Sequence, residues 1–157
     1  MYVGIFRRMF PFAVRNGLRL VTISRREYPY STPYSPSELA LLRSGNSTMN
    51  SEYFRLRSAE ILNFLAWFTK KERIHRITDT QGMKRGGIVV IGWSSGFTSV
   101  AGLLAHVDRH RRDTVNLLEP YMRSIGAYGI CGLFTMVLCK VHALTDRRAS
   151  ILLWIRH

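Results

Sequence analysis

The sequence predicts an α/β protein with a parallel sheet of about three strands and crossover helices. Three short apolar segments alternate with two longer segments whose apolar residues recur at helical spacing. The order strand, helix, strand, helix, strand is typical of parallel sheets with right-handed crossovers. The chain has 157 residues, 46% of them hydrophobic, which is enough for one domain and one core but not comfortably for two.

The first fifty residues are predicted to contain a short helix, a strand and two loops. Residues 5–14 have apolar side chains at helical spacing and are followed by Asn-Gly, a common helix end. Residues 18–23 are apolar and β-branched, which predicts a strand. Residues 28–37 contain three prolines and are predicted to be a loop, because each proline lacks a backbone donor. A short helical segment over 37–43 and a polar loop over 44–50 follow.

A long helix is expected over residues 51–72. Asn50 or Ser51 can cap it, and Glu52 lies in its first turn, where the helix dipole favours an acid. Its apolar face consists of Phe54, Ile61, Leu62, Leu65 and Phe68. Residues 74–86 are polar and contain glycine, so a loop is expected there.

The second and third strands are predicted at residues 87–91 and 123–128. The first of these is a continuous apolar run, which suits a strand that is buried on both faces. A second helix is expected over 95–109, and a partly helical connection over 117–122.

Between the second strand and the second helix lies a Gly-x-Ser-x-Gly box, Gly92-Trp93-Ser94-Ser95-Gly96. A strand that enters a helix through a very tight turn exposes the middle serine, and the flanking glycines let other backbone approach. Ser94 is therefore the candidate nucleophile. The backbone amide of Ser95 is the candidate oxyanion donor, since it lies at a helix N-terminus. The alternative is that Gly92 and Gly96 only shape a turn and Ser94 caps the helix.

In this context the chain resembles the middle of an α/β-hydrolase, particularly fungal proteins of that fold. Residues 26–34 (REYPYSTPY) resemble the family's loop after the strand preceding the elbow helix, whose usual form is Arg-Asp-x-Pro-Gly-x-[Ser/Thr]. Residues 64–68 (FLAWF) correspond to the helix that runs into the elbow strand, and residues 118–124 to the approach to the next strand. The resemblance predicts a partial α/β-hydrolase domain over 1–128. It implies hydrolysis of an ester or similar acyl bond in a small molecule.

Departures from the family predict an incomplete enzyme. Glu27 stands where the family usually has Asp, and Tyr30 where it has Gly. The family's preceding strand and His-Gly loop, which supply a second oxyanion donor, are expected to be missing, as are its triad acid and histidine. Residues 129–157 resemble nothing in the family and are expected to be a divergent, largely helical tail, with a helix within 133–144. Little or no activity is therefore expected.

No remaining histidine or acid matches the family's triad. The candidates after the serine are His106, His110, His142, His157, Asp108, Asp113, Glu119 and Asp146. His106 and His110 lie on the predicted helix that leads away from the elbow, and the two later histidines lie in the tail. His106 and His110 are four apart, a spacing that can hold zinc, but no third ligand is apparent. No metal and no cofactor is expected.

The net charge of +13 keeps a basic nucleic-acid-binding module open as an alternative function. The basic residues are scattered and match no known binding motif, so specific nucleic-acid binding is not expected. The loss of family character after residue 128 favours another alternative, a truncated, non-enzymatic product or gene-model remnant. The sequence does not indicate the oligomeric state.

Two segments imitate membrane or targeting signals. Residues 124–139 are largely apolar but short and glycine-containing, so no membrane span is expected. Residues 1–26 contain six arginines and no acid, as a mitochondrial presequence would, but they include the first predicted strand. Cys131 and Cys139 match no zinc or disulfide pattern and are expected to be buried thiols. A cytoplasmic protein is the default expectation.

Overall fold

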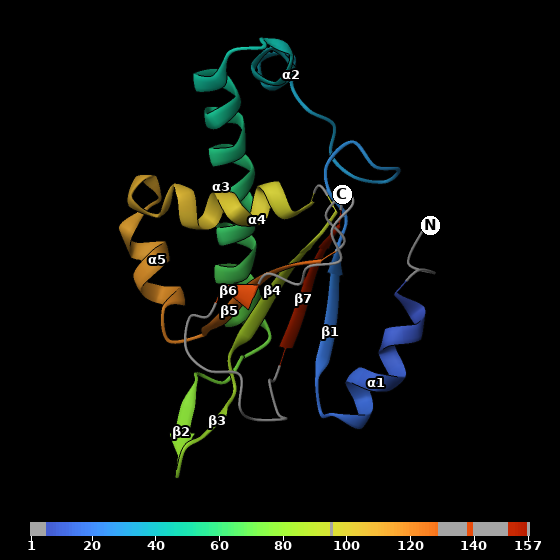
Figure 1. Cartoon of the computed structure of the whole chain (residues 1–157), viewed down its shortest axis with the longest axis vertical. Helices are drawn as coiled ribbons and strands as arrows, with labels where there is room; N and C mark the ends of the chain where they lie inside the picture. The colour runs from blue at the N-terminus through green and yellow to red at the C-terminus, as the bar shows by residue number, and fades with distance from the viewer. Residues whose placement is uncertain (1–5, 95, 129–137, 140–150, 157) are drawn as a thin grey trace.

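The computed structural model describes residues 6–94, 96–128, 138–139 and 151–156. They form a five-stranded sheet with helices on both faces, and a separate two-stranded hairpin (Figure 1). The α/β class predicted from the sequence is confirmed. Among the helices of the described residues, none has both the length and the apolar character that crossing a bilayer requires.

The elements follow one another in the predicted alternation. The first half of the chain contains η2 (Arg7–Met9), α1 (Phe10–Arg15), β1 (Arg19–Ile23), α2 (Pro36–Arg43), α3 (Ser47–Lys71), β2 (Thr78–Thr80) and β3 (Met83–Arg85). The second half contains β4 (Ile88–Trp93), α4 (Gly96–Ala105), η3 (Val107–Arg109), α5 (Arg112–Leu118), β5 (Met122–Tyr128), β6 (Leu138–Cys139) and β7 (Ile151–Arg156).

The sheet has the strand order β1-β7-β4-β5-β6. Its first four strands are parallel, and β6 is antiparallel to β5. In the register, Ile23 of β1 lies opposite Ile155 of β7, which lies opposite Gly92 of β4. The carboxyl ends of β1, β7 and β4 therefore meet at one edge of the sheet, directly before Ser94.

The tail corrects two predictions. The sheet has five strands instead of about three, and the described tail residues are strands instead of helices. Residues 151–156 (ILLWIR) pair with β1 on one side and with β4 on the other. This position pairs β7 on both sides and satisfies the backbone polar groups of β1 and β4 that face it, which a separate tail helix would leave unpaired. His142, His157 and Asp146 lie outside the described residues.

Two local predictions were also wrong. The helix α3 begins at Ser47, within the predicted loop over 44–50, because Asn46 caps it. The Asn46 side-chain oxygen accepts hydrogen bonds from the amides of Thr48 and Met49, at 2.8 and 3.3 Å. The predicted loop over 74–86 contains the exposed hairpin β2–β3, which pairs antiparallel.

The strand β4 is buried on both faces, as its continuous apolar run predicts. Residues 88–91 are each at most 7% exposed. Ile88 and Val90 pack in the larger core cluster with residues of α3, α4 and α5, whereas Val89 and Ile91 pack against Phe6 on the other face. Figure 1 shows the same layers, with α3, α4 and α5 on one side of the sheet and α1 on the other.

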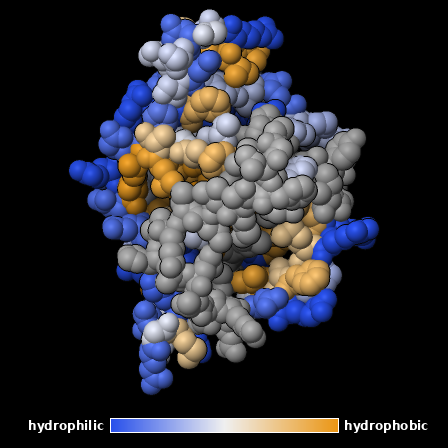
Figure 2. Space-filling model, viewed as in Figure 1, coloured by the Kyte–Doolittle hydropathy of each residue, from blue (hydrophilic) through white to orange (hydrophobic). Residues whose placement is uncertain are grey.

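Several apolar side chains remain exposed on the described surface. Phe12 and Val14 of α1 are exposed, as are Leu104 of α4 and Val107 of η3. In Figure 2, orange patches lie over the regions of α1 and α4. Such patches make low solubility the expected behaviour of this chain.

Candidate active site around Ser94

Ser94 occupies a strained turn between β4 and α4. Its φ is +55°, in the left-handed region that residues with a Cβ rarely adopt. The amide of Phe97 donates to the Ser94 carbonyl at 3.1 Å, and α4 begins at Gly96. A left-handed conformation costs a non-glycine residue about 1–2 kcal/mol. The strain lies at the residue that a nucleophile elbow would present.

Gly92 allows the start of α4 to cross close over the end of β4. A Cβ at Gly92 would lie 2.6 Å from the Cα of Phe97, 2.7 Å from its nitrogen and 2.9 Å from the carbonyl carbon of Gly96. All three are backbone atoms, which cannot move aside as a flexible side chain would. Residue 92 must therefore lack a side chain for the turn to be this tight.

Trp93 and Gly96 complete the described part of the box. Trp93 faces the α1 side of the sheet, where its ring meets Phe6 edge to face, with centroids 5.6 Å apart. Gly96 is buried at the first position of α4. Ser95 lies outside the described residues, so its amide remains a prediction.

The backbone strain at Ser94 can be tested by substitution. Changing Ser94→Gly is expected to raise the free energy of unfolding by up to about 1 kcal/mol, because glycine adopts the left-handed region without a Cβ clash. Ser99→Gly, within α4, is the matched control and is expected to lower it by about 0.5–1 kcal/mol. Urea unfolding of both variants measures the difference. A destabilised Ser94→Gly protein would show that the serine is not strained.

The described histidines lie far from Ser94. The carbonyl of His75 accepts from the amide of Gly87, at the opposite end of β4, and six strand residues span about 20 Å. His106 follows α4, whose ten residues span about 15 Å. His110 is buried, and its Nε2 lies 3.2 Å from the hydroxyl of Ser58 on α3. Burial lowers the pKa of His110, which favours the neutral ring.

The described acids after Ser94 are equally remote. Asp108 lies on η3, Asp113 in the first turn of α5, and Glu119 at the end of α5. No group of three metal-binding side chains occurs among the described residues. The part of the chain that the structure describes therefore brings no triad partner to Ser94.

A partly buried ion-pair network, which the sequence analysis missed, holds the loop over residues 26–34. Its centre is Glu38, in the first turn of α2. Arg26 binds both oxygens of Glu38, at 2.6 and 2.9 Å, and Arg57 of α3 binds one of them. Arg26 and Arg57 also contact Glu60, at 2.9 and 3.1 Å. Both guanidinium groups lie over the ring of Tyr34, so the loop is fixed against α3.

A local signal for part of this network was present in the sequence. Ser35 and Glu38 form a capping box, in which each side chain bonds the backbone of the other. The Ser-x-x-Glu spacing predicts such a box. The pairing of Glu38 with Arg57, nineteen residues later, has no local signal.

Changing Glu38→Gln is expected to lower the free energy of unfolding at pH 7 by about 2 kcal/mol, since the buried Arg57 loses a charged partner. The hydrogen bond from the Ser35 amide, with those from Arg26 and Arg57, lowers the pKa of Glu38 from 4.5 to about 2. A carboxylate with a lowered pKa stabilises the fold above its ordinary pKa, and this contribution is lost as the pH falls from about 4.5 towards 2.

Unfolding curves between pH 7 and pH 2 would test this prediction. The gap between the native protein and the Glu38→Gln variant is expected to narrow below pH 4.5. Glu119→Gln, at an exposed position, is the control and is expected to change stability little. A gap that stays constant with pH would contradict the role of the Glu38 carboxylate.

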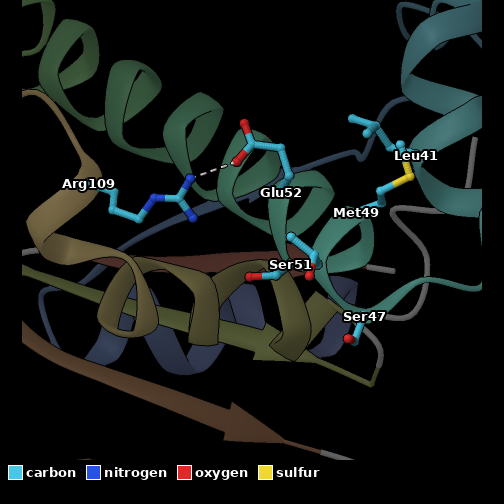
Figure 3. A pocket seen from close by; sticks show the side chains of 7 residues that line it. Leu41, Ser47, Met49, Ser51, Glu52 and Arg109 are labelled. Carbon is cyan, nitrogen blue, oxygen red and sulfur yellow. Dashed lines mark hydrogen bonds and ion pairs between the residues drawn. The ribbon is translucent and has the colours of Figure 1, made fainter.

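A pocket lies away from the elbow, between α2, the start of α3 and η3 (Figure 3). It has a volume of about 610 Å³. In Figure 3, the side chains of Arg109 and Glu52 point toward one another at one end of the pocket lining, and their ion pair measures 3.1 Å. Hydrogen bonds from Arg55, with the charge of Arg109, lower the pKa of Glu52. Its described lining contains no histidine, so it offers Ser94 no base.

Comparisons with known proteins leave the family undecided. No protein-family model, no curated protein and no solved structure matches this chain.

Proposed function

We propose that Ser94 is the nucleophile of an α/β-hydrolase-type serine hydrolase that acts on ester or similar acyl bonds, with little or no turnover by this chain. One observation carries the proposal. A serine with a φ of +55° stands between a strand buried on both faces and a helix that crosses it closely. A capping serine has extended backbone before its helix, so the strained turn favours the nucleophile over the cap.

The loop over residues 26–34 supports the family part of the proposal. Tyr30 stands where the family usually has glycine, and its φ is +70°. Glycine adopts this region readily, whereas a tyrosine is strained there. The loop thus has the backbone conformation for which the family's glycine is suited. The side chain of Tyr30 points into solvent and is fully exposed.

In the proposed ester hydrolysis, Ser94 and Ser95 would each have one role. The Ser94 hydroxyl oxygen would attack the acyl carbon, lose its proton and release the alcohol, and the amide of Ser95 would donate to the oxyanion. Water would then hydrolyse the acyl-serine. Both steps need a base to accept a proton, and the described residues provide none near Ser94. Weak turnover follows from that absence among the described residues.

A fluorophosphonate probe tests the proposal, because it reacts covalently with nucleophilic serines. The full chain is expected to label slowly and incompletely, with the adduct on Ser94 when peptides are mapped by mass spectrometry. Labelling is expected to be lost in Ser94→Ala. It is expected to remain in Ser95→Ala, which keeps the backbone amide and removes only the neighbouring hydroxyl.

Two outcomes would overturn parts of the proposal. Labelling that persists in Ser94→Ala, or that never reaches Ser94, would show that the turn does not carry a nucleophile. Rapid, stoichiometric labelling that is lost in Ser94→Ala would show that a working base exists and that the chain is active.

A further inference from the structure

Cationic and apolar side chains lie together on the outer side of η2 and α1, on the face of the sheet opposite α3 (Figure 1). In Figure 2, orange and blue atoms lie side by side over the region of α1. Clusters of large apolar side chains on a surface mark interaction sites. We call this set the α1 surface, and it consists of Arg7, Arg8, Phe10, Phe12, Val14 and Arg15, all of them exposed.

The apolar members of the α1 surface are unusually accessible for their size. Phe12 is 62% exposed and Val14 is 76% exposed, whereas Phe10 is 37% exposed. Burying such side chains away from water is favourable, so the fold leaves apolar area here that a partner can cover.

The cationic members have no carboxylate partner among the described residues. None of the ion pairs in the described part of the chain involves Arg7, Arg8 or Arg15. The guanidinium group of Arg15 lies 5.0 Å from the ring centroid of Phe12, a contact that leaves its positive charge in place. Residues 1–26 contain no acid, so the α1 surface attracts anions.

The backbone that carries these side chains is held firmly against the sheet. Phe6 and Met9 pack in the smaller core cluster with residues of β4, and Ala13 is buried. The Asn16 side-chain nitrogen donates to the carbonyl of Phe12 at 2.7 Å, which satisfies an acceptor at the end of α1. The exposed side chains are therefore preorganised, and little backbone order has to be gained when they bind.

The combination of charge and apolar area favours one kind of partner. A nucleic acid would neutralise the arginines but would leave Val14 and Phe10 in water. A second copy of the chain would bring the same arginines against one another. A bilayer with anionic headgroups takes both parts, because phosphates and carboxylates accept from guanidinium groups and the acyl boundary takes apolar side chains.

We propose that the α1 surface docks on the face of a lipid bilayer that contains anionic lipids. Phe12, Val14 and Phe10 enter the boundary between headgroups and acyl chains, and the arginines stay at the level of the headgroups. This is binding at the interface, which is distinct from crossing the membrane. It goes beyond the proposed function and does not depend on the reactivity of Ser94.

Sedimentation of the full chain with lipid vesicles tests the proposal. Vesicles of phosphatidylcholine with about one third phosphatidylserine are expected to bind it at least about tenfold more tightly than vesicles of phosphatidylcholine alone. Binding is expected to weaken steeply in about 1 M salt, where the Debye length is only about 3 Å. Equal binding to the two kinds of vesicle would overturn the proposal.

The net charge of +13 makes a matched pair of double variants necessary, since any strongly basic protein is attracted to anionic lipid. Changing Arg7→Gln with Arg8→Gln removes two charges from the α1 surface. Changing Arg111→Gln with Arg112→Gln removes two exposed charges at the start of α5, on the other side of the sheet.

Only the first double variant is expected to bind anionic vesicles much more weakly. Each arginine at an anionic surface contributes about fivefold, so a loss of about tenfold or more is expected there and of less than about threefold in the second. Equal losses would show that net charge alone drives binding, and they would overturn the assignment to the α1 surface.

A second pair of variants tests the apolar contribution. Phe12→Ser is expected to weaken binding to anionic vesicles about tenfold. Trp67→Ser removes an aromatic ring that is 56% exposed on α3, on the other side of the sheet, and is expected to stay within about twofold. Unchanged binding in Phe12→Ser would show that the ring does not enter the bilayer and would overturn the proposal.

Two further measurements separate this proposal from its competitors. Size-exclusion chromatography that shows a dimer in the native chain and a monomer in Phe12→Ser would make a second copy the partner and overturn the proposal. Ser94→Ala is expected to bind anionic vesicles as the native chain does. Failure of the fluorophosphonate experiment with intact vesicle binding would overturn only the proposed hydrolase function.

Discussion

Changing Gly92→Ala is expected to lower the free energy of unfolding by about 3 kcal/mol, a large effect for a single methyl group. The added Cβ would lie 2.6 Å from a backbone atom of Phe97, so α4 would have to move away from β4. That movement would disturb the packing of Val100 and Leu103, which are buried in the main core. Urea unfolding followed by circular dichroism measures the loss.

Gly82→Ala provides the matched control for this substitution. Gly82 lies in the exposed hairpin turn with a φ of +78°, and a Cβ there would meet nothing within 4 Å. Only the left-handed backbone opposes alanine at this position, so a loss of about 1 kcal/mol is expected. Equal losses in the two variants would show that α4 does not cross β4 as closely as the structure places it.

Changing Leu153→Pro is expected to lower the free energy of unfolding by about 3 kcal/mol or more, because proline cannot donate to the strand ladder. Leu153 lies at the centre of β7, opposite Val21 of β1 and Val90 of β4. β7 is the strand through which β1 and β4 are joined in the described sheet. Thermal unfolding and amide hydrogen exchange in β1 and β4 measure the effect.

Met83→Pro, in the exposed strand β3, is the control for a proline placed outside the main sheet. It is expected to leave hydrogen exchange in β1 and β4 unchanged, since the hairpin β2–β3 is a separate two-stranded sheet. If Leu153→Pro also leaves β1 and β4 protected, then β7 does not hold these strands together.

The elements that carry the core were predictable from local pattern. Residues 88–91 are apolar without interruption because both of their faces are buried, and α3 has apolar residues at helical spacing because one of its faces packs on the sheet. The strand β7 was missed. A short apolar run does not distinguish a strand from a buried helix, and its partners lie far away in the sequence.

Of the candidate site, only the backbone turn between β4 and α4 was predictable from the sequence. The Gly-x-Ser-x-Gly box placed Ser94 and Gly92 at the turn, because a tight strand-to-helix turn demands specific residue types at fixed offsets. The ion-pair network around Glu38 was not predictable as a whole. Arg26 follows β1, Glu38 lies on α2 and Arg57 on α3, so only the folded chain brings them together.

The position of β7 in the sheet also constrains how the protein is made. Arg19 of β1 pairs with Ile151, about 130 residues later, and Ile151 also pairs with Ile88 of β4. During synthesis, β1 and β4 leave the ribosome long before the strand that joins them. Both would then expose unpaired strand edges, and contacts over such long sequence separations form slowly. The growing chain is therefore expected to depend on chaperones until β7 is inserted.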